Sequence, residues 1–229
     1  MNQPSFGSSD FSSSTALQGF MQRVYQWMAA GLALTGFVAL MAASNMGLMR
    51  ALAGGGFLVL MLAELGLVFW LSASISKISP TAAVAGFLVY SALNGLTLSF
   101  IFLVYTGASI ATTFFITAAT FGAVSLFAWT TKADLSSMRG ILMMALIGFL
   151  IASVVNLFLQ SPAFYWILTY AGLAIFIGLT AYDTQTLKQW HQSGVVAGEQ
   201  MAILGALKLY LDFINLFLLL LRLFGRRRD

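Results

Sequence analysis

The chain has 229 residues, of which 60% are hydrophobic and only 8% are charged. About a quarter of the residues in an ordinary soluble domain carry charge, so this composition excludes that class and predicts an integral membrane protein. The formal net charge of +4 does not indicate nucleic-acid binding, because the basic residues are scattered or gathered at the C-terminal end, where anionic lipid headgroups explain them.

The first segment, residues 1–22, is rich in serine and has no basic region ahead of an apolar core. We therefore expect a disordered cytoplasmic tail and not a signal peptide. Residues 24–49 carry no charge and predict a first membrane helix that ends near Ala43. A second span is expected over residues 57–74, where Glu64 is the single charged residue.

Longer uncharged runs predict pairs of helices. Residues 78–131 carry no charge and are too long for one span, so we expect helices three and four with a connection near Thr106. Residues 140–182 are also uncharged and are interrupted by polar residues and a proline at 160–162, which gives helices five and six.

The last apolar segment, residues 201–221, carries Lys208 and Asp212 and would be costly to expose to lipid. We expect it to be a central helix, either a full seventh span or a re-entrant segment. Arg222 and residues 226–228 suit a helix C-terminus and an interfacial anchor. The predicted fold class is an all-α polytopic membrane bundle of seven transmembrane helices in one domain.

The basic residues also predict an orientation. An N-terminus inside the cell puts most basic residues of the short connections on the inner side, against Arg50 on the other. Those inner residues are Arg23, Lys77, Lys132, Arg139 and Lys188. The N-terminus is therefore expected to be cytoplasmic. A full seventh span would then leave the arginine-rich C-terminus outside, whereas a re-entrant segment would return it inside.

Three acids lie within or beside the apolar segments: Glu64, Asp183 and Asp212. A charge at the bilayer centre costs at least about 2.5 kcal/mol, so such groups face the protein interior and have partners or protons. An antiparallel hairpin of the last two helices that turns near Val196 places Asp183 and Asp212 at nearly the same level. The mismatch is about three residues, or ~4.5 Å at the helical rise, which allows contact.

Two carboxylates in one apolar site cannot both carry charge cheaply, so the pair is expected to hold one proton and to sense pH. When the proton leaves, repulsion separates the helices or a hard cation such as Ca²⁺ replaces it, because that ion takes oxygen ligands. Spacing alone also allows a structural pair or two independently solvated acids. Glu64 is a candidate cation ligand or pore-lining acid, the alternative being a protonated, buried side chain.

Three C-terminal motifs resemble those of a known family. They are residues 181–185 (AYDTQ), 209–217 (LYLDFINLF) and 221–225 (LRLFG). They resemble the Bax inhibitor-1 (transmembrane BAX inhibitor motif) family, in its bacterial inner-membrane branch, and the likeness covers nearly the whole chain after the tail.

The resemblance implies a single seven-helix domain over residues 23–229, with its last helix central, in the bacterial inner membrane. It also implies a pH-dependent calcium leak governed by an aspartate pair. By position, Asp183 and Asp212 match that pair, and Glu64 matches the acid of the second helix.

Two positions depart from the family pattern. Calcium-leaking relatives carry an arginine shortly after the second-helix acid, where this chain has Leu71 and Ser72. Lys208 stands where a small uncharged residue is usual, four residues before Asp212 and therefore on the same helix face. An ammonium there would compete with a bound cation unless it extends away from the site.

The leading functional hypothesis is a passive calcium or cation leak under proton control, with Ca²⁺ as the permeant ion. No tightly bound cofactor is expected, because the sequence lacks a Walker-type phosphate loop. The alternative is a membrane interaction protein without transport activity, which modulates or is degraded by a membrane-embedded AAA protease that grips the tail over residues 1–22.

An enzyme is the third class considered. Asp183 after a tyrosine and Asp212 outline an intramembrane aspartyl protease, but Tyr210 occupies the place of the required glycine. A serine–histidine dyad would need His191, which lies in a polar connector. Cysteine is absent, which excludes thiolate nucleophiles and cysteine-bound zinc. We therefore expect a protein that is not an enzyme.

Overall fold

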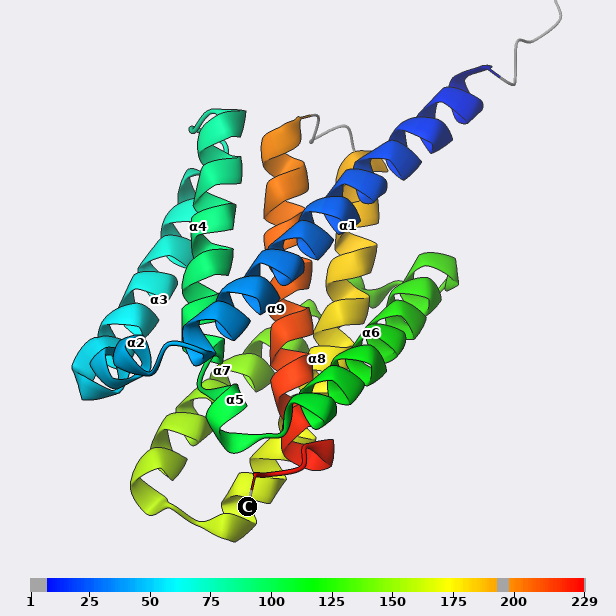
Figure 1. The fold of residues 1–229 in the computed structure, drawn as a ribbon. Coiled ribbons are helices and arrows are strands. Elements are labelled where there is room, and N and C mark those ends of the chain that lie inside the picture. Colours follow the sequence, from blue (N-terminus) through cyan, green and yellow to red (C-terminus); the bar gives the residue numbers. More distant parts are fainter. Residues whose placement is uncertain (1–7, 193–197, 229) are drawn as a thin grey trace, which may run out of the picture.

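A computed structural model describes residues 8–192 and 198–228 and shows a bundle of helices (Figure 1). In chain order the elements are α1 (Ser8–Ala43), α2 (Met46–Ala51), the π-helical turn η1 (Leu52–Gly56), α3 (Phe57–Ser74), α4 (Pro80–Leu98), α5 (Ile101–Val104), α6 (Gly107–Thr130), the 3-10 turn η2 (Leu135–Met138), α7 (Arg139–Leu159), α8 (Pro162–Gln192) and α9 (Glu199–Phe224). In this part of the chain, 7 helical segments are long and apolar enough to cross a membrane, which confirms the predicted fold class.

Helix boundaries coincide with local capping signals. The side chains of Asn45, Ser79 and Thr106 accept hydrogen bonds from backbone amides at the starts of α2, α4 and α6. Between α2 and α3 the chain bends at Gly55, whose φ of 109° lies in a region that only glycine adopts at low cost. Together α2, η1 and α3 form the second segment that is long and apolar enough to cross a membrane, Met46–Ser74.

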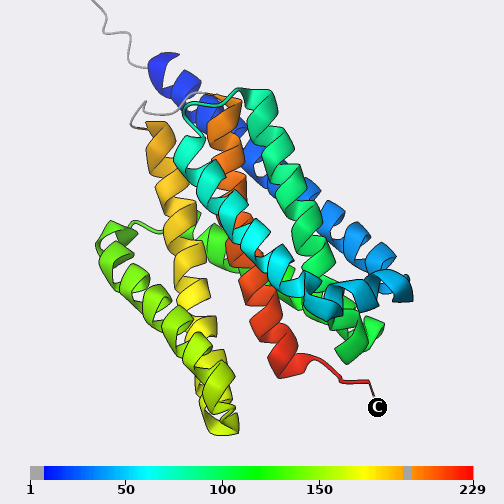
Figure 2. The same cartoon turned by 90° about the vertical axis from the view of Figure 1, so that its left-hand side faces the viewer.

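Helix α9 occupies the centre of the bundle (Figures 1 and 2). It packs against α1, α4, α6 and α8. Its 26 residues form one continuous helix, which at the helical rise is about 39 Å long, more than the ~30 Å of a bilayer core. By length and composition the last helix is therefore sufficient for a full span, and its continuity gives no support to the re-entrant alternative.

The N-terminal segment is more ordered than expected. The prediction of a disordered tail over residues 1–22 is wrong for residues 8–22, which belong to α1; residues 1–7 lie outside the described residues. Leu17, Phe20 and Met21 are buried in the core cluster that includes residues of α9. Their i, i+3, i+4 spacing makes an apolar stripe, and burial of that stripe explains why the serine-rich segment is helical.

Helix α7 lies at the edge of the bundle beside α8 (Figure 2). The connection before α7 is held by Gln185 of α8, which donates to the Ala133 carbonyl and accepts from the Leu135 amide. Because α7 packs on α8 and away from the α3–α4 pair, α3 and α7 stand on opposite sides of a cavity next to α9.

Candidate functional site

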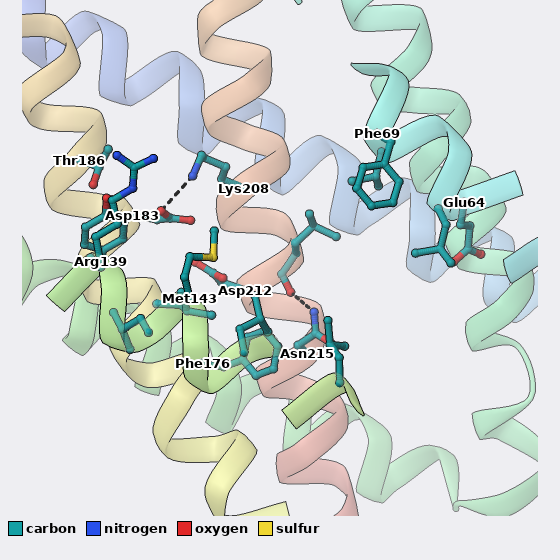
Figure 3. A pocket seen from close by; sticks show the side chains of 18 of the residues that line it. Glu64, Phe69, Arg139, Met143, Phe176, Asp183, Thr186, Lys208, Asp212 and Asn215 are labelled. Atoms are coloured by element: carbon teal, nitrogen blue, oxygen red, sulfur yellow. Dashed lines mark hydrogen bonds and ion pairs between the residues drawn. The ribbon is translucent and has the colours of Figure 1, made fainter. Parts of the chain in front are cut away.

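A cavity of about 640 Å³ lies between α3, α4, α7, α8 and α9 (Figure 3). Most of its wall is apolar, but five charged residues line it: Glu64, Arg139, Asp183, Lys208 and Asp212. The tyrosines on its wall are Tyr90 and Tyr182. The fold therefore brings all three predicted acids to one cavity, from three different helices.

Asp183 is only 7% exposed and forms an ion pair with Lys208. The Lys208 Nζ lies 3.1 Å from Asp183 Oδ1 (Figure 3). The same ammonium lies 5.7 Å from the ring centroid of Trp190, close enough for a cation–π interaction. Lys208 thus extends across to α8, and its ion-pair partner is Asp183 rather than the acid one turn later on its own helix.

Asp212 lies near the middle of α9 and is 4% exposed. Its Oδ2 is buried and has no hydrogen-bond partner in the described part of the chain. A buried carboxylate oxygen without a donor costs several kcal/mol when it is charged, unless a proton or a cation compensates it. The predicted hairpin does bring Asp183 and Asp212 together at one cavity, but the hydrogen bond of Asp183 goes to Lys208.

Glu64 of α3 takes part in a separate hydrogen-bond network, whose first members lie on α4. It accepts hydrogen bonds from Thr97 at 2.5 Å and from Asn94 Nδ2 at 3.3 Å. The Tyr210 hydroxyl donates to Asn94 Oδ1 at 3.1 Å and lies 2.6 Å from Thr35 Oγ1. This chain of polar contacts joins α3, α4, α9 and α1. Figure 3 shows Glu64 set apart from the two aspartates across the cavity.

The three acids share a cavity without sharing one coordination sphere. Within residues 8–192 and 198–228, no three acids or histidines are close enough together to hold a metal ion. Any cation between Asp183 and Asp212 would need further oxygen ligands from water, because Ca²⁺ takes six to eight of them.

Several site residues were not identified from the sequence. Arg139 at the start of α7 lines the cavity, and Asn94, Thr97 and Tyr210 hold Glu64 or its partners. Two of them could have been found from the i, i+3 spacing of Asn94 and Thr97, which puts both polar side chains on one face of an apolar helix.

The Tyr210 hydroxyl offers a direct test of the polar chain. We expect Tyr210→Phe to lower stability by about 1–2 kcal/mol, because Asn94 Oδ1 loses its donor in a buried place. Thermal unfolding in detergent measures this effect. Tyr170→Phe is the matched control, since Tyr170 is 60% exposed, and it should change little. Equal unfolding temperatures for the two variants would show that the polar contacts of Tyr210 do not stabilise the bundle.

Comparison with known proteins supports the family resemblance that the C-terminal motifs indicate. The family model described as inhibitor of apoptosis-promoting Bax1 matches residues 17–229. Inner membrane protein YbhL of Escherichia coli (strain K12) is 52% identical over 225 residues, covering 93% of both chains. An uncharacterized protein of Deinococcus radiodurans is 46% identical, covering 92% of this chain and 91% of its own. One of Borreliella burgdorferi is 41% identical, covering 92% of this chain and 93% of its own.

These matches cover almost the whole chain, and the family match begins within the N-terminal segment that the structure shows as helical. They confirm the resemblance that residues 181–185, 209–217 and 221–225 indicate. The chain belongs to the Bax inhibitor-1 family.

Proposed function

We propose that this protein is a pH-sensitive passive leak for calcium in the bacterial inner membrane, gated by Asp183 and Asp212. The observation that carries the proposal is the buried, unpartnered Oδ2 of Asp212 at the middle of the central helix, on a cavity shared with Asp183. The inner-membrane location follows the printed name of the Escherichia coli relative and the seven apolar helices. The excess of basic residues in the short connections favours a cytoplasmic N-terminus.

The charges around the cavity supply the proposed gate. Lys208 balances one of the two aspartates, so the second carboxylate needs a proton or a cation of its own. The other groups facing the pair are Glu64 from α3, Tyr90 from α4, Arg139 from α7 and Tyr182 from α8. At acidic pH the second carboxylate holds a proton and gives a cation little to bind. At higher pH the proton leaves and calcium takes its place.

Lys208 acts in this scheme as a tethered competitor for the cation site. Its side chain is 33% exposed and has a flexible stem, and its ammonium already contacts the face of Trp190, which can hold it when the ion pair breaks. Calcium binding to Asp183 requires the ammonium to leave the carboxylate. The ion pair and the proton therefore hold the closed state together.

Calcium flux into proteoliposomes tests the proposal. Purified protein in liposomes with an internal calcium indicator should pass calcium faster at pH 8 than at pH 6, and faster than protein-free liposomes at pH 8. Flux equal to that of protein-free liposomes at every pH would contradict a leak and leave a scaffold.

The described residues favour neither of the alternatives. A protease grip on residues 1–22 has less support, because residues 8–22 are helical and Leu17 and Phe20 are buried. We propose no enzymatic activity: the Tyr210 position is filled by a buried, hydrogen-bonded ring, and the side chain of His191 lies outside the described residues.

A further inference from the structure

A second cavity, also of about 640 Å³, lies at the C-terminal end of α9 and shares no residue with the proposed cation site. It is bounded by the end of α7, the α7–α8 connection, the start of α8 and the C-terminal segment. Arg222 and Arg227 line it, and among residues 8–192 and 198–228 no acid does. The cavity is therefore electropositive, unlike the acid-rich cavity at the middle of the bundle.

Contacts hold the Arg222 side chain and the backbone on either side of Arg227. The Arg222 guanidinium lies 5.2 Å from the ring centroid of Tyr165. The C-terminal segment pairs with the α5–α6 connection, because Thr106 N donates to the Arg226 carbonyl and Arg228 N donates to the Val104 carbonyl, each at 2.9 Å. Arg227 lies between these two anchored residues. Arg222 and Arg227 both line the cavity, where each planar guanidinium can donate two parallel hydrogen bonds to the oxygens of a phosphate.

The same cavity contains a polar atom that requires a donor. Asn156 Oδ1 is buried and has no hydrogen-bond partner in residues 8–192 and 198–228. Asn156 lines the cavity together with the arginines. A bare anion cannot satisfy this oxygen, because an anion is itself an acceptor. The arrangement fits a ligand that carries a negative charge and, a short distance away, a hydroxyl donor.

The surroundings of the cavity indicate where that ligand comes from. The last residues of α7, Leu157, Phe158 and Leu159, are 72%, 84% and 63% exposed, and Ile167 on α8 is 61% exposed. Trp166, which lines the cavity, is 44% exposed and suits a membrane interface. A ligand at this place therefore has hydrocarbon neighbours, as a phospholipid has.

We propose that this cavity binds the headgroup of an anionic phospholipid whose phosphodiester carries a hydroxyl-bearing alcohol, the chemistry of phosphatidylglycerol. The phosphodiester pairs with Arg222 and Arg227, and the headgroup hydroxyl donates to Asn156 Oδ1. The acyl chains lie along the exposed apolar surface of α7 and α8. This site is separate from the proposed cation site, because the two cavities have no residue in common.

Native mass spectrometry of the full-length protein in detergent tests the site with three lipids of equal chain length. These are phosphatidylglycerol, phosphatidylmethanol, which has the phosphodiester charge but no hydroxyl, and phosphatidylcholine. Wild-type protein should retain phosphatidylglycerol best and phosphatidylcholine least. Arg227→Gln should reduce retained phosphatidylglycerol about tenfold, as expected for a lost charge-assisted contact. Arg226→Gln removes the same charge from a neighbour that does not line the cavity, and should change it less than twofold.

Asn156→Leu should remove the preference for phosphatidylglycerol over phosphatidylmethanol while both remain bound. Equal losses in Arg226→Gln and Arg227→Gln would overturn the proposal in favour of diffuse attraction to the basic C-terminus. If millimolar glycerol phosphate or inorganic phosphate displaced the lipid, the ligand of the cavity would be a soluble phosphate compound, and the lipid proposal would be wrong. Equal retention of all three lipids by wild-type protein would also overturn the proposal, because the cavity would then not select a headgroup.

Discussion

Asp212→Asn is expected to reduce calcium flux at pH 8 to within about twofold of protein-free liposomes and to remove its dependence on pH. Asparagine is neutral at every pH, so of the aspartate pair the cavity keeps only Asp183, which Lys208 already balances. The same variant should unfold at a temperature no lower than wild type, because an unpartnered buried carboxylate does not stabilise the fold. Flux assays and thermal unfolding on one preparation measure both results.

Asp134→Asn is the control for that experiment. Hydrogen bonds from Ser136 hold the pKa of Asp134 below its ordinary value, and the side chain is fully exposed in the α6–α7 connection. This acid therefore stays charged between pH 6 and pH 8, and its loss should leave the pH profile unchanged. If Asp212→Asn kept the wild-type profile, Asp212 would not be the sensor. A fall of several degrees in its unfolding temperature would instead indicate a structural role.

Lys208→Met is expected to raise calcium flux at pH 8 by about tenfold and to move the pH of half-maximal flux upward. Removal of the ammonium frees Asp183 for the cation, but it also leaves two uncompensated carboxylates that hold their proton to higher pH. A tenfold change corresponds to about 1.4 kcal/mol, which is modest beside the ~4 kcal/mol between unit charges 4 Å apart at an effective dielectric constant of about 20.

Two further variants make the Lys208 experiment specific. Lys208→Arg keeps the charge and should stay close to wild type. Lys188→Met removes a lysine of α8 that contacts Trp129 and does not line the cavity, so it should not raise flux. Unchanged or lower flux in Lys208→Met would show that the ion pair does not restrain conduction.

Much of the fold could be predicted from the sequence because charges are rare and helix ends carry local signals. The first span ends at Ala43, as predicted, and α3 covers the predicted 57–74, although the second membrane segment also includes α2 and η1 and begins at Met46. The start of α1 at Ser8 could not be predicted from composition. Leu17, Phe20 and Met21 stabilise that helix by contacts with distant residues, and the surrounding serines obscure their spacing.

The candidate site was predictable to the level of individual helices but not of their contacts. Residue counts along a hairpin place Asp183 and Asp212 at similar heights, since the helical rise is constant. Counts do not fix the rotation of one helix against another. For that reason they gave neither the Lys208–Asp183 pair nor the contacts of Glu64 with Asn94 and Thr97, which depend on the faces that α3, α4, α8 and α9 present to each other.

The most direct test of the aspartate gate is the number of protons released when calcium binds. Titration calorimetry of the detergent-purified protein near pH 7, in two buffers with different heats of ionisation, gives that number. About one proton should be released per bound calcium, because the ion replaces the proton held by the pair. An Asp183→Asn, Asp212→Asn double variant should release none. Calcium binding without proton release, or the same release from the double variant, would contradict the aspartate gate.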